Sequence, residues 1–140
     1  MGQRRDCTWI LGLAGFRVVR AASDGEHSAS RLIIQIERHQ RRRYLCGGCG
    51  RRMGRVRSMK ARTWDDLPWA AHPVTLVYRQ RRIICRRCGI RTERIEFADR
   101  KARVTRRLRQ QIGVDCQSMP TSHAAVRHGV SWGKAFGANN

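Results

Sequence analysis

The chain has 140 residues, which allows one domain or two small ones. Its hydrophobic content of 41% and its four tryptophans indicate a folded chain, and no run approaches the roughly 18–20 apolar residues of a membrane-spanning helix. The formal net charge is +20, and most of the 30 basic residues are arginines. Because guanidinium groups bind phosphate bidentately, this balance favours nucleic acid as the partner, and no membrane partner is predicted. A GC-rich genome would also favour arginine codons, but it does not explain why only ten residues are acidic.

The first third of the chain predicts a helical turn followed by a β-hairpin. Residues 9–16 form an apolar run that glycines interrupt, and residues 16–21 have the composition of a strand. In residues 31–37 the side chains of Leu32, Ile34 and Ile36 fall on one face, which is the period of a half-buried strand. The two strands leave a polar turn between them and lead into the first cysteine pair.

Four cysteines form two identical Cys-x-x-Cys pairs, each followed by a glycine: Cys46 and Cys49 before Gly50, and Cys85 and Cys88 before Gly89. Two such turns brought together present four thiolates in the tetrahedral arrangement of a structural zinc site. Each glycine lets the backbone turn with positive φ, so that amide N–H groups face the sulfurs. The 35-residue spacer is longer than the usual ribbon spacing of about 15–20 residues, so strands must return the second turn to the first. The sequence therefore predicts one Zn²⁺ ion held by all four cysteines.

Two other interpretations of these cysteines are open. Disulfides need an oxidising compartment, yet the early apolar run is too short and too rich in glycine for a secretory signal. A redox Cys-x-x-Cys normally occurs once, at a helix start, so two copies fit shared ligation better. Cys7 and Cys116 stand alone and are predicted to be buried free thiols. We therefore expect a cytoplasmic, nucleoid-associated protein.

The spacer and the residues after it predict further strands. Residues 51–62 are too basic to form a core segment, and the adjacent acids Asp65 and Asp66 are predicted to cap a turn or to pair with arginines rather than to bind a catalytic metal. Residues 74–84 read as a strand that feeds Cys85, and residues 90–97 complete a hairpin with it. Residues 8–98 are thus predicted to form a small, antiparallel, zinc-ribbon-like domain, and residues 99–103 a basic linker.

Residues 104–140 change to a helical pattern. Val104, Leu108, Ile112 and Cys116 recur every four positions as an amphipathic stripe, with a helix start near Thr105. A second helix is predicted to begin at a Thr121 cap and to end at Gly129, and Ser131 is predicted to cap a third. Ala125, Gly129 and Val130 complete the spacing of a helix-turn-helix. His123 and His128 are predicted to lie at the surface. The fold class is therefore α+β, a small zinc-ribbon-like β unit followed by a helix-turn-helix segment.

The basic residues are concentrated beside the cysteine pairs. Residues 38–62 contain ten basic residues and no acid, and residues 70–91 contain six arginines and no acid. A metal that draws the two pairs together would join both runs into one basic surface, which is the charge pattern that phosphate backbones attract. Together with the helical segment, the candidate DNA-contacting residues are Arg41, Arg42, Arg43, Arg51, Arg52, Arg55, Arg81, Arg82, Arg86, Arg87, Arg106, Arg107, Ser131, Trp132 and Lys134.

Several of these motifs occur together in a recognisable order: Leu11-Gly12-Leu13, Cys46-x-x-Cys49-Gly50, Asp66-Leu67-Pro68-Trp69, Arg81-Arg82 before Cys85-x-x-Cys88, Thr92-Glu93 and Gly129-Val130-Ser131-Trp132. This combination resembles the N-terminal part of insertion-sequence transposases of the ISL-three group. The resemblance implies that the four paired cysteines are the metal ligands and that the zinc region and the helix-turn-helix recognise double-stranded DNA at the transposon ends. It also implies that catalysis belongs to a downstream RNase H-like domain with an acidic triad.

The sequence departs from that group in two respects. The 140 residues leave no room for the catalytic domain, so we expect no enzymatic activity and interpret the chain as a truncated or frameshifted gene or a fragment. The last helix of the motif contains Gly133 and Gly137, each of which costs roughly 1 kcal/mol relative to alanine, so we expect a weak or frayed helix and little sequence discrimination. The alternative function is a basic zinc-ribbon module that binds RNA or a protein partner. A homodimer is compatible with either.

Overall fold

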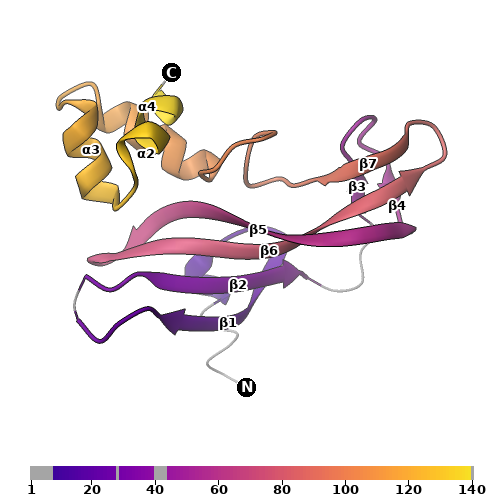
Figure 1. The fold of residues 1–140 in the computed structure, drawn as a ribbon, viewed down its shortest axis with the longest axis horizontal. Helices are drawn as coiled ribbons and strands as arrows, with labels where there is room; N and C mark the ends of the chain where they lie inside the picture. Colours follow the sequence, from indigo (N-terminus) through magenta and orange to yellow (C-terminus); the bar gives the residue numbers. More distant parts are fainter. Residues whose placement is uncertain (1–7, 28, 40–43, 140) are drawn as a thin grey trace. The chain divides into compact units, whose positions relative to one another are not determined.

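The computed structural model describes residues 8–27, 29–39 and 44–139, and these residues have an α+β architecture, as predicted (Figure 1). A helical turn at residues 8–11 precedes the strands. The strands are β1 (Phe16–Ser23), β2 (Leu32–Arg38), β3 (Tyr44–Cys46), β4 (Arg52–Met53), β5 (Val56–Trp69), β6 (His72–Cys85) and β7 (Gly89–Arg94). The helices are α2 (Arg106–Asp115), α3 (Thr121–His128) and α4 (Trp132–Asn139). No helix in the described part of the chain is long and apolar enough to cross a membrane.

The seven strands form one sheet in the order β1-β2-β6-β7-β3-β4, and β5 pairs with β6. The predicted hairpins at residues 16–37 and 74–97 are therefore present as β1–β2 and β6–β7. Strand β7 pairs antiparallel with β6 through Cys85 and Gly89, and with β3 through Cys46 and Glu93. This register brings the ends of β3 and β6, which carry the two cysteine pairs, to the same neighbour. The long spacer thus returns to the first pair by means of strands.

The described chain divides into two compact units. The first, which we call the ribbon unit, comprises Met1–Arg20, Gln35–Arg62 and Val77–Glu96, and the second, the helical unit, comprises Ala21–Ile34, Thr63–Leu76 and Phe97–Asn140. The unit boundaries fall within the long strands β1, β2, β5 and β6. The boundaries at residues 98 and 103 remain a prediction.

The ribbon unit has a small apolar core. Phe16 and Tyr78 pack edge to face, with ring centroids 5.5 Å apart, and Val18 and Ile36 are also buried. At the cysteine end the buried cluster consists of Cys46, Ile83 and Cys85, with Tyr44, Cys49, Met53 and Cys88 packed against it. Four of the seven residues of this cluster are therefore the cysteines themselves.

Strand β5 is the main difference from the sequence prediction. Residues 56–61 are exposed, which agrees with the absence of a core segment there, but they form a strand. The predicted turn at Asp65 and Asp66 is wrong, because both residues lie within β5 and the chain turns at residues 70–71. Strand β5 is held by its pairing with β6, so its first half does not need an apolar face, and Pro68 is tolerated near the end of such a strand.

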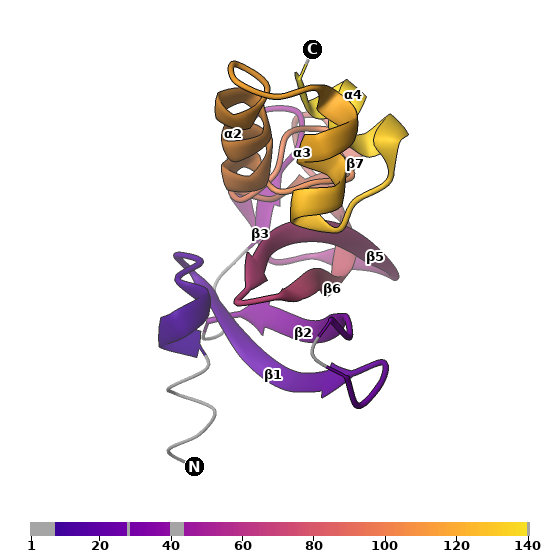
Figure 2. The same ribbon diagram turned by 90° about the vertical axis from the view of Figure 1, so that its left-hand side faces the viewer.

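The helical unit has a separate core, to which all three helices contribute. Val104, Leu108 and Ile112 of the predicted stripe are buried together with Ala124, Ala125 and Ala135, and Leu67, Cys116, Met119 and Val130 pack against them. Figure 2 shows α2, α3 and α4 grouped side by side. Thr105 caps α2 by accepting a hydrogen bond from Leu108 N, as expected, whereas α3 has its N-cap at Pro120 rather than at Thr121.

Candidate functional site: a four-cysteine centre and a helix-turn-helix

Each cysteine pair lies in a tight turn at the end of a strand. Cys46 ends β3 and Cys85 ends β6, and the following turns carry Cys49 and Cys88. Gly50 and Gly89 have φ values of +75° and +76°, the left-handed conformation that the sequence predicts for them. Backbone amides point at the sulfurs, as Gly48 N donates to Cys46 Sγ at 3.3 Å and Arg87 N donates to Cys85 Sγ at 3.4 Å. The two turns have matching geometry.

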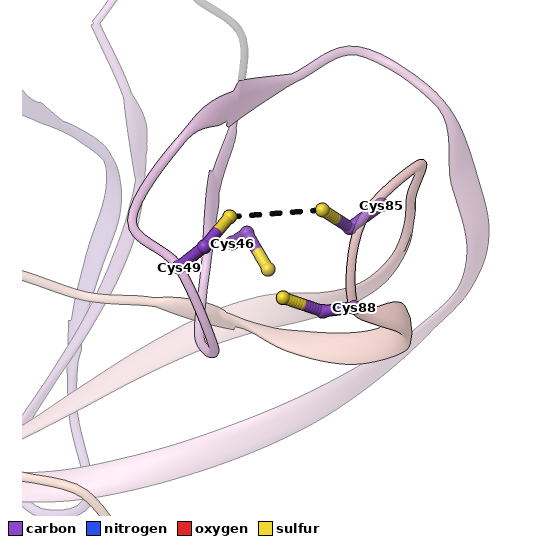
Figure 3. Close-up of side chains that lie close together, drawn as sticks. All are labelled: Cys46, Cys49, Cys85 and Cys88. Atoms are coloured by element: carbon purple, nitrogen blue, oxygen red, sulfur yellow. Dashed lines mark hydrogen bonds between the residues drawn. The ribbon is translucent and has the colours of Figure 1, made fainter.

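The four sulfurs face one another across a small space (Figure 3). All four ligand atoms lie within 4.8 Å of one another, and Cys49 Sγ is 3.7 Å from Cys85 Sγ. A tetrahedron with Zn–S bonds of about 2.3 Å has S···S edges of about 3.8 Å, so the cage has the size that zinc requires. An all-sulfur, four-coordinate set with no open position is a structural centre rather than a catalytic one. The four cysteines form the zinc site that the sequence predicts.

The thiols differ in acidity because their surroundings differ. Backbone hydrogen bonds from Cys88 and Arg87 lower the pKa of the Cys85 thiol to about 6. Burial and the neighbouring thiols raise the pKa of Cys88 to about 12. Four thiolates cannot share this space without a counterion, whereas a divalent cation stabilises all of them. Zinc binding must therefore displace protons from the cage.

A buried carboxylate beside the centre supports its strands, and sequence analysis did not single it out as a functional residue. Glu93 of β7 is 2% exposed and pairs with Cys46 in the sheet register. It accepts hydrogen bonds from Tyr78 Oη at 2.7 Å, Arg81 N at 2.8 Å and Arg38 Nε at 3.0 Å. Burial and the Glu93 charge raise the pKa of Tyr78 above its usual range, so the phenol remains a donor. Its place in the Thr92-Glu93 motif of the family resemblance is a signal that could have identified it.

The structure places the predicted DNA-contacting residues in three classes. Exposed side chains belong to Arg51, Arg52, Arg55, Arg82, Arg86, Arg87, Arg106, Ser131 and Trp132. Partly buried ones belong to Arg81, Arg107 and Lys134. Arg41, Arg42 and Arg43 lie outside the described residues. The Arg81 guanidinium carbon lies 5.0 Å from the ring centroid of Tyr44 and 5.3 Å from that of Tyr78, which fixes this side chain by cation–π contact.

The helix-turn-helix consists of α3, a turn at Gly129 and α4. Gly129 ends α3 with φ +65°, and a Cβ built on it would lie 2.5 Å from Pro73 Cγ, so the turn requires glycine for both conformation and space. Arg31 Nη2 donates to the Gly129 carbonyl, which fixes the turn to the strands of the same unit. The expected surface position of His128 is wrong: it is 5% exposed, and its Nε2 lies 2.6 Å from Asp115 Oδ2.

Helix α4 forms despite its glycines. Ser131 Oγ accepts a hydrogen bond from Lys134 N at 3.3 Å, which is the predicted cap, and Ala135 is fully buried. Lys134 Nζ lies 2.6 Å from Asp65 Oδ2 of β5. These contacts offset the low helix propensity of Gly133 and Gly137.

The adjacent aspartates are both buried and paired with cations, in agreement with the non-catalytic interpretation. Asp65 contacts Lys134, Thr75 and Arg31, and Asp66 accepts hydrogen bonds from Thr105 Oγ1 at 2.7 Å and Arg107 Nε at 2.8 Å. They hold parts of the helical unit against β5.

Comparisons with known proteins matched both the cysteine region and the helical region of the chain. Residues 42–88 match the family model for the zinc-finger of transposase IS204/IS1001/IS1096/IS1165. Residues 93–134 match the model for the helix-turn-helix domain of transposase family ISL3. No curated protein and no solved structure matched the chain. The chain carries the zinc-ribbon and helix-turn-helix domains of ISL3-family transposases.

Proposed function

We propose that the ribbon unit and the helical unit bind double-stranded DNA and recognise the ends of an insertion sequence. The helix-turn-helix lies in the groove, and arginines of the ribbon unit contact phosphates. The observation that carries this proposal is the helix-turn-helix itself, in which a left-handed Gly129 joins two helices that share a core. In this class of motif the second helix enters the major groove, while surrounding cations fix the register on the phosphates.

The charge of the ribbon unit supports phosphate contact. None of the ion pairs among the described residues involves Arg51, Arg52, Arg86 or Arg87, all of which are exposed and flank the cysteine turns. Because no carboxylate of the described residues pairs with them, their positive charge is available to an external polyanion. The exposed half of β5 adds Arg57 and Lys60 to the predicted set.

We also propose that the ribbon unit and the helical unit by themselves do not cut or join DNA. The only adjacent acid pair in the described helical and strand regions, Asp65 and Asp66, is buried against cations, which leaves it unable to hold a catalytic magnesium ion. Incubation of the purified chain with supercoiled plasmid and Mg²⁺ should leave the plasmid intact. Cleavage that persists through further purification and disappears in Asp66→Ala would overturn this part of the proposal.

A competition experiment tests the binding. Fluorescence anisotropy of a labelled random-sequence duplex should rise on addition of the zinc-loaded protein, and unlabelled duplex DNA should displace the label better than double-stranded RNA of equal length. The variant with Arg51, Arg52, Arg86 and Arg87 all changed to alanine should bind more weakly, whereas Arg17→Ala, at an arginine already paired with Glu37 at 2.9 Å, should bind almost normally. Preference for RNA, or the absence of binding to either, would favour the RNA or protein-partner alternative.

A further inference from the structure

Helix α4 exposes two large aromatic side chains on one face. Trp132 is 57% exposed and Phe136 is 46% exposed. They lie one turn apart in the helix and stack on each other, with ring centroids 4.9 Å apart and ring planes 18° from parallel (residues 132 and 136 lie on α4, labelled in Figure 1). Two stacked aromatic rings form a continuous apolar surface on an otherwise strongly basic chain, and such a surface indicates a contact site.

The same helix has little capacity to hydrogen-bond to a ligand on this face. Lys134 is its only charged residue, and its ammonium group is held 2.6 Å from Asp65, which is 5% exposed and also contacts Thr75 and Arg31. The Ser131 hydroxyl is engaged as the helix cap. A Cβ built on Gly133 or Gly137 would meet no atom within 4 Å, so the helix surface next to the aromatic pair is bare backbone.

We propose that α4 reads DNA by apolar contact, with the Trp132–Phe136 pair packed against thymine C5-methyl groups in the major groove. This inference rests on the proposed DNA binding. The thymine methyl is the one apolar group that the major groove presents, and it distinguishes A·T from G·C pairs without any hydrogen bond. Asp65 is a positioning residue in this arrangement, because its ion pair with Lys134 ties α4 to the strand of its own unit.

Duplex DNA is the occupant that the chemistry favours. A protein partner for a chain of net charge +20 would be expected to be strongly acidic, whereas the one charged residue of α4, Lys134, is already paired with Asp65. The aromatic pair lies on the helix that follows the Gly129 turn, and in a helix-turn-helix this second helix is the one that enters the major groove. Contact with one or two methyl groups gives modest discrimination, so phosphate contacts elsewhere still supply most of the affinity.

Replacing thymine by deoxyuridine removes the methyl group and changes no base-pairing group, so it tests the proposal directly. A binding site is first selected by the wild-type zinc-loaded protein from a pool of random-sequence duplexes, and the selected duplex is then synthesised with thymine or with deoxyuridine. We expect the selected sites to contain thymine and the deoxyuridine duplex to bind about four-fold more weakly for each methyl group removed from the aromatic pair. Phe136→Ser and Trp132→Ser should bind both duplexes equally, at the affinity of the wild type for the deoxyuridine duplex.

The matched control is Val126→Ser on α3, which removes another exposed apolar side chain and should keep the thymine preference. Circular dichroism and zinc content establish that each variant is folded. Equal binding of the two duplexes by the wild type, or selected sites without thymine, would overturn the methyl contact while leaving DNA binding intact. Failure of the wild type to bind any duplex would instead overturn the proposed function.

Discussion

The ribbon unit and the helical unit are both small and highly charged, but they are stabilised in different ways. The cysteine end of the ribbon unit has a buried cluster of only Cys46, Ile83 and Cys85, so a metal must supply what the small core cannot. The helical unit has a larger buried apolar cluster, in which Val104 packs with five side chains from α2, α3 and α4. One unit therefore depends on a metal, and the other on apolar packing and paired charges.

The use of the few acidic side chains also differs between the two units. In the helical unit Asp65, Asp66, Asp99 and Asp115 each pair with a cation of the same unit, and three of the four are buried. In the ribbon unit Glu37, Glu93 and Glu96 pair with Arg17 and Arg38, but none of the ion pairs among the described residues involves Arg51, Arg52, Arg86 or Arg87 beside the cysteine turns. These four arginines therefore keep their charge for an external partner. This contrast predicts that changes at the cysteine turns of the ribbon unit affect metal binding and phosphate contact, and that changes to the core or the paired charges of the helical unit affect folding.

Loss of one zinc ligand should have the largest effect. Cys85→Ser should release the metal, from one zinc per chain to nearly none, and unfold the cysteine end, because metal affinity in such domains is folding free energy. Acidification of the wild type should release zinc too, since protons compete for the thiolates. Elemental analysis and circular dichroism under reducing conditions measure both effects. Cys116→Ser is the control, because this free thiol of the helical unit lies outside the cage, and it should keep the zinc.

The dependence of DNA affinity on salt concentration should show how much of the binding comes from phosphate contacts of the ribbon unit. If the protein engages about six to ten phosphates, affinity for duplex DNA should fall about 10³–10⁵-fold between 50 and 200 mM salt. Replacement of Arg41, Arg42 and Arg43 together by alanine should weaken binding to all duplexes alike and flatten the slope of log K against log salt. Anisotropy titrations at several salt concentrations measure this slope. An unchanged slope would show that these arginines do not contact phosphate, and a thousand-fold preference for one sequence would contradict phosphate-dominated binding.

The turn of the helix-turn-helix should be intolerant of a side chain. Gly129→Ala would place a Cβ at φ +65° and 2.5 Å from Pro73 Cγ, so we expect a loss of about 2–4 kcal/mol of unfolding free energy, from left-handed strain and overpacking. Gly133→Ala is a matched control, since its Cβ would meet nothing within 4 Å, and it should stabilise α4 by about 0.5–1 kcal/mol. Denaturant titration measures both, and neither change should alter the zinc content.

The parts of the molecule that local chemistry constrains could be predicted from the sequence. The ligands follow from the doubled Cys-x-x-Cys-Gly, because few other functions need four thiols at that spacing. The α2 stripe and the Gly129 turn follow from helical periodicity and from the conformation that only glycine adopts easily. Each of these signals lies within a few residues of chain.

The parts that depend on distant partners could not be predicted. The exposed half of β5 has no apolar alternation and becomes a strand because β6 pairs with it. His128 has the polarity of a surface residue and is buried because Asp115 lies beside it. The ion pair of Lys134 could not be predicted either, because its partner Asp65 lies 69 residues earlier in the chain. In each case the deciding neighbour is distant in sequence.

The buried Asp115–His128 pair gives the smallest effect and the clearest dependence on pH. It joins α2 to α3, with both side chains about 5% exposed, and Asp115 also accepts a hydrogen bond from Gln111 at 3.1 Å. Burial alone would raise the pKa of Asp115, but the hydrogen bonds from His128 and Gln111 outweigh it and lower the pKa. A lowered folded-state pKa means that the pair stabilises the fold fully above the unfolded value of about 3.9, and that this contribution is lost as the pH falls through the folded value.

Asp115→Asn should therefore reduce the unfolding free energy by about 1–3 kcal/mol at pH 7, and its difference from the wild type should shrink below about pH 4. Glu37→Gln, at the exposed pair with Arg17, should change stability by less than about 1 kcal/mol. Urea titrations at pH 7 and at pH 3–4 measure the comparison, and a difference that stays constant with pH would show that Asp115 acts through packing rather than through its charge.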